Sequence, residues 1–222
     1  MNLVFDIGMN NGADTRRYLL QGHRVVAVEA DPRLCAAACE KFADSIESGQ
    51  LRVLNVGLGG HVGSGTFYVN TRFDEWSSFN KTLASRVPGQ PGVHDESIAE
   101  PMKIPVVTFA HLVENYGMPW YAKIDVEGHD HYCLRDVVKM EGRPTFMSVE
   151  FSGAALGLLP RTGYTRFKLV NQKHHNDRAS GHAGDDAVDV LFGRAWTTLE
   201  RLENTYADVA KWPTWWDIHM TN

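Results

Sequence analysis

The chain has 222 residues, 43% of them hydrophobic and 22% charged, and a formal net charge of −5 at pH 7. This composition is typical of an ordinary globular domain with one sizeable core. The acidic balance argues against a dedicated nucleic-acid-binding protein, because phosphate contacts need clustered Lys and Arg. No apolar run approaches the length of a membrane span. The three cysteines have no zinc-ligand spacing and predict free thiols in a reducing, cytoplasmic compartment.

A short apolar run, residues 3–7, is the first predicted strand and ends in a glycine-containing turn. Its sequence, Leu-Val-Phe-Asp-Ile, suits a strand buried on both faces. Gly8 and Gly12 permit a tight turn and the close approach of a ligand to the start of the next helix, predicted at residues 14–21. A nucleotide-like ligand is therefore the first hypothesis, and a plain turn without a ligand is the alternative.

The spacing of the glycines distinguishes between ligands. A dinucleotide-binding turn needs glycines where Asn10 and Ala13 stand. Asp6, at the end of the strand, would repel a phosphate but attract a ligand that carries an ammonium group and a positive sulfur. The turn therefore favours S-adenosylmethionine over a dinucleotide.

The second predicted strand, residues 24–29, also ends in an acid. Glu29 follows Gly8 by about 20 residues, the distance at which α/β nucleotide sites place a carboxylate on the ribose hydroxyls. An ionised carboxylate accepts strong hydrogen bonds from such hydroxyls. Two acids at two successive strand ends favour this role over a simple strand terminus.

A helix and a third strand continue the alternation. Asp31 is a predicted N-cap and Pro32 the first residue of the helix. The third strand is predicted at residues 51–56, and its end offers Asn55 and Val56 as contacts for an adenine ring. An ordinary strand end without a ligand is the alternative for these two residues.

Between about residues 57 and 105 the pattern loosens, because Gly, Ser, Asn and Pro become frequent. We expect an insertion here, with a small strand at 65–69. Residues 88–96 are predicted to form a mobile surface loop, with a substrate lid as the alternative. A strand-like run resumes at 104–108.

The fourth and fifth predicted strands, residues 121–128 and 145–150, carry further acids. Residues two apart in a strand share a face, so Asp125 and Glu127 point into one crevice if the strand extends that far. Glu150 ends the fifth strand. Together with the acids that end the first two strands, these carboxylates would gather at one edge of the sheet. Because bare like charges destabilise a fold, we expect a ligand site there.

The C-terminal part, about residues 171–222, is predicted to form a cap and an edge strand. It contains a polar loop at 171–186, a helix at 194–211 and an aromatic tail at 212–219 that forms the edge strand or covers the sheet. The spacing of the loop's histidines and aspartates matches no known metal site, so a solvated loop is favoured; these residues are His174, His175, His182, Asp185 and Asp186. We expect the whole chain to form one domain.

Four segments, in this order along the chain, resemble the FkbM family of S-adenosylmethionine-dependent methyltransferases. They are residues 6–15 (Asp-Ile-Gly-Met-Asn-Asn-Gly-Ala-Asp-Thr), 28–32 (Val-Glu-Ala-Asp-Pro), 123–128 (Lys-Ile-Asp-Val-Glu-Gly) and 148–150 (Ser-Val-Glu). The resemblance implies an α/β, Rossmann-like class I methyltransferase fold, with a seven-stranded, mostly parallel sheet, a reversed edge strand and flanking helices. It also implies methyl transfer from S-adenosyl-L-methionine to a hydroxyl of a sugar, a polyketide or a similar small molecule.

The resemblance assigns candidate roles to individual residues. The cofactor loop of the family matches Asp6, Gly8, Asn10, Gly12 and Thr15, and its ribose-binding acid matches Glu29. The acids beside the transferred methyl group match Asp125 and Glu127, which are favoured as the general base over the third catalytic candidate, Glu150. The set of candidate cofactor contacts is completed by Ala30, Asn55, Val56, Ser78 and Asp125.

Several alternatives stay open. His129 and His131 are further candidate bases, although we expect them to begin the helix that follows. A divalent metal held by Asp125 and Glu150 would also acidify a hydroxyl, but no third ligand is evident and no metal is expected. A nicotinamide-dependent oxidoreductase and a catalytically silent nucleotide-binding domain are the alternative functions. The expected partner is a small-molecule hydroxyl acceptor, without nucleic acid or membrane, and the sequence does not indicate an oligomeric state.

Overall fold

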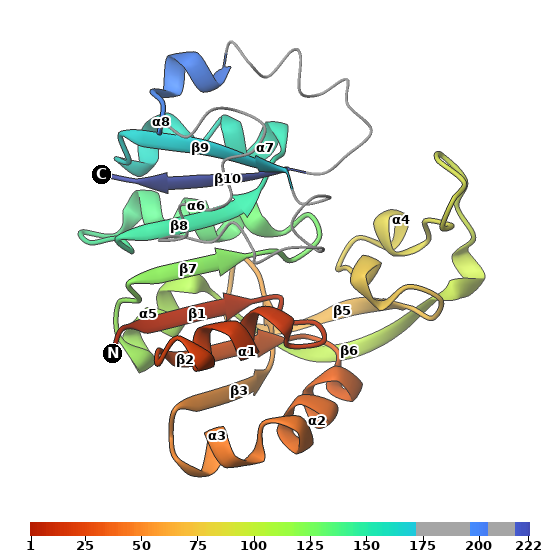
Figure 1. Cartoon of the computed structure of the whole chain (residues 1–222). Helices are drawn as coiled ribbons and strands as arrows, with labels where there is room; N and C mark the ends of the chain where they lie inside the picture. Colours follow the sequence, from red (N-terminus) through yellow and green to blue (C-terminus); the bar gives the residue numbers. More distant parts are fainter. Residues whose placement is uncertain (172–195, 204–215) are drawn as a thin grey trace.

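A computed structural model describes residues 1–171, 196–203 and 216–222. Its centre is a seven-stranded sheet (Figure 1). The strand order is β3 (Leu51–Asn55), β2 (Arg24–Glu29), β1 (Leu3–Ile7), β7 (Tyr121–Ile124), β8 (Phe146–Glu150), β10 (Trp216–Thr221) and β9 (Arg166–Asn171). The strands from β3 to β8 run parallel to their neighbours, whereas β10 runs antiparallel to both β8 and β9. The predicted α/β class with a mostly parallel sheet is confirmed.

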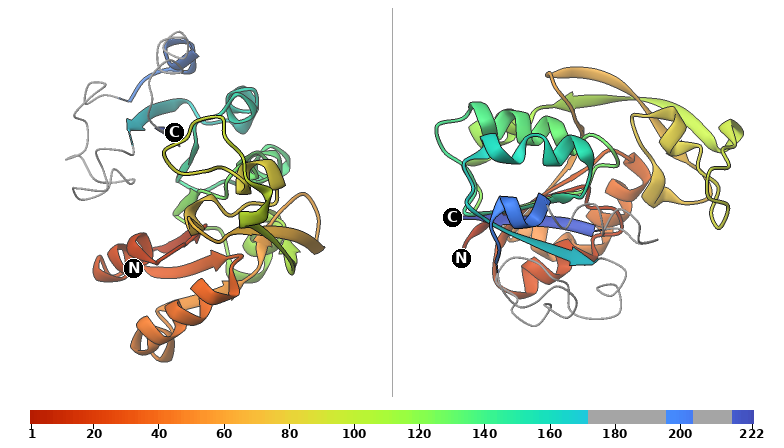
Figure 2. Two further views of the ribbon diagram at one scale, coloured as in Figure 1. Left: turned by 90° about the vertical axis from the view of Figure 1, so that its right-hand side faces the viewer. Right: turned by 90° about the horizontal axis from the view of Figure 1, so that it is seen from above.

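Helices cover both faces of this sheet (Figure 2). One face carries α1 (Ala13–Leu20), α2 (Pro32–Lys41) and α3 (Ala43–Glu47), and the other carries α5 (Phe109–Tyr116), α6 (Asp130–Lys139), α7 (Gly153–Leu156) and α8 (Leu159–Thr162). Successive residues of β1 serve opposite faces, because Val4 packs in the cluster of Tyr18 while Phe5 contacts Phe109 edge to face. Burial on both faces fixes β1 at the centre, with its carboxyl end at the edge of the sheet where β2, β7 and β8 also end.

Local signals place the start of α2 where the sequence predicts it. Asp31 is its N-cap and accepts a hydrogen bond from the Arg33 amide at 2.8 Å, and Pro32 is the first helical residue. The strands that end in Glu29 and Glu150 also end where predicted. Capping and strand-end acids therefore identify the corresponding elements correctly.

The predicted edge position of the C-terminal strand is wrong. β10 lies between β8 and β9, pairs with both, and has all six residues buried. Its apolar residues Trp216, Ile218 and Met220 are at most 3% exposed. An inner strand, with a neighbouring strand on each side, buries such residues well. The edge strand is β9, and the reversed strand expected at the edge is an inner one.

The fourth core strand is shorter than predicted. β7 ends at Ile124, and the backbone then turns through Glu127, with φ of 47°, and Gly128, with φ of 94°. Asp125 and Glu127 therefore lie in the turn between β7 and α6 and do not share a strand face. Positive φ values are incompatible with a continuing strand.

A second sheet follows β3 in the chain, in the range where an insertion is expected. It consists of β4 (Gly57–Leu58), β6 (Ala99–Val107) and β5 (Gly63–Asn70), in that order. β5 and β6 are antiparallel and extend past the carboxyl ends of the main strands (Figure 1). The segment between them contains the short helices η1 (Asp74–Trp76), α4 (Lys81–Ala84) and η2 (Glu96–Ile98). This segment lies over the edge of the sheet where the acids gather.

Only part of the C-terminal prediction falls on described residues. Residues 199–203 are helical, within the helix predicted at 194–211. The histidines and aspartates of the polar loop lie outside the described residues. Within residues 1–171, 196–203 and 216–222, every helix is too short or too polar to span a membrane.

Candidate active site

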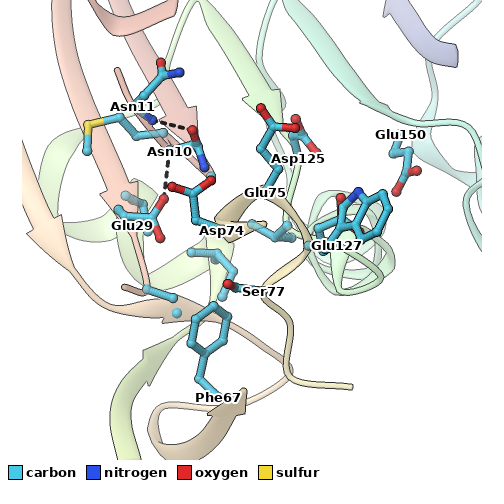
Figure 3. Close-up of a pocket in the computed structure, with 18 of the residues that line it drawn as sticks. Asn10, Asn11, Glu29, Phe67, Asp74, Glu75, Ser77, Asp125, Glu127 and Glu150 are labelled. Carbon is cyan, nitrogen blue, oxygen red and sulfur yellow. Dashed lines mark hydrogen bonds between the residues drawn. The ribbon is translucent and has the colours of Figure 1, made fainter. Parts of the chain in front are cut away.

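A cavity of about 540 Å³ opens at the carboxyl edge of the main sheet. Its walls come from the turn after β1, the ends of β2, β7 and β8, and the segment 73–79 of the second sheet (Figure 3). This is the edge at which open α/β sheets bind ligands, and the volume is in the range of ligand pockets. One end holds Asn10 and Glu29, and the other end holds Glu127 and Glu150 (Figure 3).

The turn after β1 packs tightly against the turn after β7. Gly8 has φ of 82°, and a Cβ on it would lie 1.7 Å from the Asp125 carbonyl oxygen. Gly12 has φ of 73°, and its Cβ would lie 2.6 Å from the ring of Phe42. Only glycine combines these backbone angles with such close contacts. Gly8 thus allows the two acid-bearing turns to approach each other, and Gly12 allows the turn after β1 to pack against Phe42.

The Glu29 carboxylate is fixed by the main chain. Its Oε2 accepts a hydrogen bond from the Asn10 amide and its Oε1 one from the Asp31 amide, both at 2.8 Å. Burial raises the pKa of Glu29, and these two hydrogen bonds oppose the rise. Each oxygen keeps a lone pair that can accept a further hydrogen bond. The side chain of Asn55 donates to the carbonyl oxygens of Glu29 and Ala30 and supports this end from behind.

Lys123, on β7, is the centre of a buried charge cluster. Its Nζ donates to the Gly8 carbonyl oxygen at 3.0 Å and lies 3.5 Å from Asp14, 3.5 Å from Asp125 and 3.7 Å from Asp6. Burial alone would lower the pKa of Lys123, but the surrounding carboxylates outweigh it and raise that pKa. The ammonium group therefore stays charged inside the protein.

Asp6 and Thr15 lie behind the cavity wall. Both are fully buried, and the Thr15 hydroxyl donates to Asp6 Oδ2 at 2.5 Å. Neither residue lines the cavity. In this arrangement Asp6 acts on a ligand only through the Lys123 cluster.

Glu127 is held by residues of the second sheet. Arg86 donates to its Oε2 at 2.5 Å, and the Ser78 hydroxyl donates to its carbonyl oxygen at 2.7 Å. Arg86 also lies over the ring of Trp76, 4.9 Å from its centroid. These contacts maintain the left-handed backbone of Glu127, a conformation that costs a non-glycine residue about 1–2 kcal/mol. Burial raises the pKa of Glu127 to about 8; the Glu150 carboxylate adds to the rise and Arg86 opposes it.

Two further carboxyls near Glu127 titrate close to neutral pH. Burial raises the pKa of Glu150 to about 7, with Asp130 and Asp125 adding to the shift. Asp130, the first residue of α6, has its pKa raised to about 7 by burial and by Asp125. Clustered acids of this kind exchange protons in the pH range where an enzymatic base works.

The cavity brings together most of the predicted site residues. Those that line it are Gly8, Asn10, Glu29, Ala30, Val56, Asp125, Glu127 and Glu150. Those that do not are Asp6, Gly12, Thr15, Asn55 and Ser78. The second group supports the first through the hydrogen bonds and packing described above.

The two histidines of the turn have other contacts. His129 Nδ1 lies 3.0 Å from the Leu58 carbonyl oxygen, and its ring stacks on Phe79 at 4.7 Å. His131 Nδ1 lies 3.2 Å from the Gly128 carbonyl oxygen. Neither lines the cavity. Within the described ranges, no three or more His, Cys, Asp or Glu residues are placed to hold a metal ion.

The sequence-based site prediction lacks several contributors to the wall, among them the segment 73–77, Arg86 and Lys123. The segment 73–77 and Arg86 approach from the second sheet, and Lys123 approaches from β7. The sequence does contain a signal for Lys123, a cation in a buried strand, since such a lysine needs charged partners. It contains none for Arg86, whose partner Glu127 is 41 positions away.

The strand order and the cavity at its carboxyl edge agree with the class I methyltransferase fold that the sequence predicts. Residues 6–176 match the family model described as "Methyltransferase FkbM domain". The chain belongs to this family of methyltransferases. The nicotinamide-dependent alternative is therefore not retained. No curated protein matches the chain.

Solved structures of methyltransferases resemble the fold. Methyltransferase FkbM from Methylobacillus flagellatus KT is 12% identical with a TM-score of 0.45, and the match covers 76% of this chain and 39% of that one. Precorrin-6y C5,15-methyltransferase from Geobacter metallireducens GS-15 is 9% identical with a TM-score of 0.42 (99% and 78% covered). Phosphoethanolamine N-methyltransferase 2 from Haemonchus contortus, solved with S-adenosyl-L-methionine, is 10% identical with a TM-score of 0.43 (100% and 48%). The chain thus spans 39% of the length of the FkbM structure.

Proposed function

We propose that this methyltransferase transfers the methyl group of S-adenosylmethionine to a hydroxyl oxygen of a small molecule such as a sugar or a polyketide. One observation carries the proposal. A single cavity combines a main-chain-anchored acid, Glu29, at one end with Glu127, a carboxyl of pKa about 8, at the other. The first suits ribose hydroxyls and the second suits the removal of a hydroxyl proton.

The residues present fit S-adenosylmethionine. Glu29 has lone pairs for the ribose hydroxyls, Val56 and Phe67 offer apolar surface for the adenine, and Asp125 offers a charge partner for the ammonium group. When bound, S-adenosylmethionine supplies an electrophilic methyl group. The protein's main contribution is then to hold the acceptor oxygen close to this group and in line with the bond that breaks.

Glu127 is our candidate for the general base. An aliphatic hydroxyl is a weak nucleophile until it gives up its proton, and a base within reach typically contributes about 10²–10⁴-fold. Arg86 orients the Glu127 carboxylate, and Ser78 fixes its backbone. The Glu150 carboxylate contributes by helping to raise the pKa of Glu127.

The charge of the cavity wall supports a neutral acceptor. Among the described residues that line it, eight carry carboxylates and two, Arg86 and Lys123, carry positive charges. Anionic acceptors, including nucleic acids, would be repelled by this excess of negative charge. The carboxylates are those of Asp14, Glu29, Asp74, Glu75, Asp125, Glu127, Glu150 and Asp217.

The proposal is tested by titration and then by turnover. Calorimetry should show saturable binding of S-adenosylmethionine and S-adenosylhomocysteine and no binding of NAD. Turnover is then followed by mass spectrometry with a methyl-labelled donor and a panel of neutral sugars, polyketides, amines, carboxylates and RNA. A label attached to oxygen on a neutral hydroxyl supports the proposal.

Other outcomes contradict parts of it. A product methylated on nitrogen or on RNA would overturn the acceptor chemistry and leave the donor intact. Cofactor binding with no turnover on any acceptor would support the catalytically silent alternative. The Glu127→Gln variant is the matched control, since it should bind S-adenosylhomocysteine and lose turnover.

A further inference from the structure

The amino-acid end of S-adenosylmethionine carries a carboxylate, and most backbone amides of the turn after β1 already have acceptors within the protein. A helix N-terminus commonly binds anions through unpaired backbone amides. Here the amides of residues 8–13 all donate within the protein, to Val28 O (Gly8 and Met9), Glu29 Oε2 (Asn10), Asn10 Oδ1 (Asn11), Met9 O (Gly12) and Asn11 Oδ1 (Ala13). The first turn of α1 also carries the Asp14 carboxylate. A cation in the cavity wall beside this turn is therefore a suitable partner for a ligand carboxylate.

Two cations line the cavity among the described residues, and they differ in how closely a carboxylate holds them. Arg86 donates to Glu127 at 2.5 Å and comes from the second sheet, at the Glu127 end of the cavity. Lys123 comes from β7, beside the turn after β1, where Gly8 and Asp125 also lie. The position of Lys123 is therefore the one that suits the amino-acid end of a ligand whose ribose contacts Glu29.

The Lys123 ammonium has hydrogen-bonding capacity to spare. It has three N–H donors, and its hydrogen bond at 3.0 Å to Gly8 uses one of them. Asp14 and Asp125 lie at 3.5 Å and Asp6 at 3.7 Å, which are ion-pair distances outside the range of good N–H···O hydrogen bonds. Two donors can thus turn to a ligand without breaking a short hydrogen bond.

We propose that Lys123 binds the carboxylate of the amino-acid end of S-adenosylmethionine, while Asp125 and the Gly8 carbonyl oxygen bind its ammonium group. This inference rests on the proposed function. The ligand's two opposite charges then replace the loose Lys123–Asp125 ion pair with two close ones, so that the charge balance of the buried cluster is preserved. Lys123 thereby selects ligands that have a carboxylate over analogues that lack it.

The first test compares two ligands on the unmodified protein by calorimetry. Decarboxylated S-adenosylmethionine keeps the sulfonium and the ammonium group but lacks the carboxylate. We expect it to bind about 10- to 100-fold more weakly than S-adenosylmethionine, the range for one hydrogen bond between charged groups. Equal binding of the two ligands overturns the inference. Binding of neither ligand, nor of S-adenosylhomocysteine, is a failure of the proposed function itself.

The second test asks which cation is responsible. In Lys123→Gln the affinity for S-adenosylmethionine should fall about 10- to 100-fold, while that for the decarboxylated ligand stays within about threefold, so the preference disappears. The matched control is Arg86→Gln, which removes the other cavity cation and should keep the preference. A preference retained in Lys123→Gln, or lost only in Arg86→Gln, overturns the assignment.

Folding of the variant is checked by circular dichroism and thermal unfolding, because Lys123 neutralises buried carboxylates. If Lys123→Gln does not fold, Lys123→Arg keeps the charge and replaces it in the comparison. This variant should still prefer the ligand with the carboxylate. Equal affinity for both ligands in folded Lys123→Arg contradicts the inference.

Discussion

The two ends of the cavity hold their carboxylates in different ways. Glu29 accepts hydrogen bonds from two backbone amides, whereas Glu127 is held by one side chain, Arg86, that reaches across from the second sheet. Backbone donors are set by the main fold, so the Glu29 end is formed as soon as the sheet is. The Glu127 end forms where the turn after β7 meets the segment 73–86. The residues at this end of the cavity can therefore differ without altering the main sheet.

The largest effect is expected from Glu127→Gln. If the Glu127 end supplies the base, kcat should fall about 10²–10⁴-fold because the amide cannot accept the proton. The affinity for S-adenosylhomocysteine, measured by calorimetry, should stay within about threefold because the Glu29 end is untouched. The matched variant is Glu150→Gln; if it loses more turnover than Glu127→Gln, the base is Glu150.

Glu29→Ala is expected to weaken cofactor binding at the other end of the cavity. It removes the proposed ribose acceptors and leaves the amides of Asn10 and Asp31 without partners. Two hydrogen bonds to a charged group correspond to a loss of affinity of about 100-fold or more. Calorimetry with S-adenosylhomocysteine measures this loss, and Glu29→Gln, which keeps the shape and one oxygen, should lose less. Unchanged affinity in Glu29→Ala would place the ribose elsewhere.

The pH dependence of turnover tests the role of Arg86. A base must be deprotonated to act, so with a pKa of about 8 for Glu127, kcat/KM should rise with pH and level off above about 8. Arg86→Gln removes the cation that opposes this raised pKa, so the rise should move upward by about one pH unit. Arg86→Lys keeps the positive charge, so the pH at which kcat/KM rises should move less than in Arg86→Gln. An unchanged profile in Arg86→Gln would mean that another group is titrating.

Stability as a function of pH tests whether the Glu150 carboxyl is destabilising when ionised. Its pKa of about 7 in the folded protein exceeds its ordinary value of 4.5. The folded state therefore binds more protons than the unfolded state between these values, and stability falls as pH rises from about 4.5 to about 7. Glu150→Gln lacks this loss, so its Tm should exceed that of the unmodified protein at pH 8 by about 2–4 °C for each kcal/mol recovered.

The control for this stability prediction is the same comparison at a lower pH. At pH 5 the difference in Tm between Glu150→Gln and the unmodified protein should be smaller, because the folded state still holds the proton. A difference independent of pH would assign the effect to packing.

Ser78→Ala is expected to have the smallest effect. Ser78 donates to the Glu127 carbonyl oxygen and does not line the cavity. Its loss should cost about 1 kcal/mol of stability, read as a lower Tm, with the affinity for S-adenosylhomocysteine within about twofold. A tenfold loss of that affinity would instead support the prediction from the sequence that Ser78 contacts the cofactor.

The Glu29 end could be predicted from the sequence because its signals are local. A strand ending in an acid, an Asp31 cap and a glycine turn are readable from neighbouring residues. Glu127 and Glu150 were also predicted as site residues, but the contact of Arg86 with Glu127 could not be predicted, because these two residues meet only through the tertiary fold. The side chain that orients the candidate base is therefore visible only in the structure.

The start of β6 was also missed, for a physical reason. The prediction began at residue 104, whereas β6 begins at Ala99 and contains Pro101 and Pro105. Proline normally excludes an inner strand because it lacks an N–H donor. Over these residues β6 pairs only with β5, since β4 meets it at Val106 and Val107 alone. An edge position tolerates proline, and this position is not evident from the sequence.

The inner position of β10 has a consequence for how the protein folds. Among the described strands, β9 pairs with β10 alone, although residues 172–215 separate the two strands along the chain. Until β10 arrives, β8 presents an open row of backbone donors and acceptors, which is a template for association with other chains. Such a late, non-local pairing slows folding and prolongs the life of aggregation-prone intermediates. Low temperature during synthesis and slow dilution during refolding should therefore favour soluble protein.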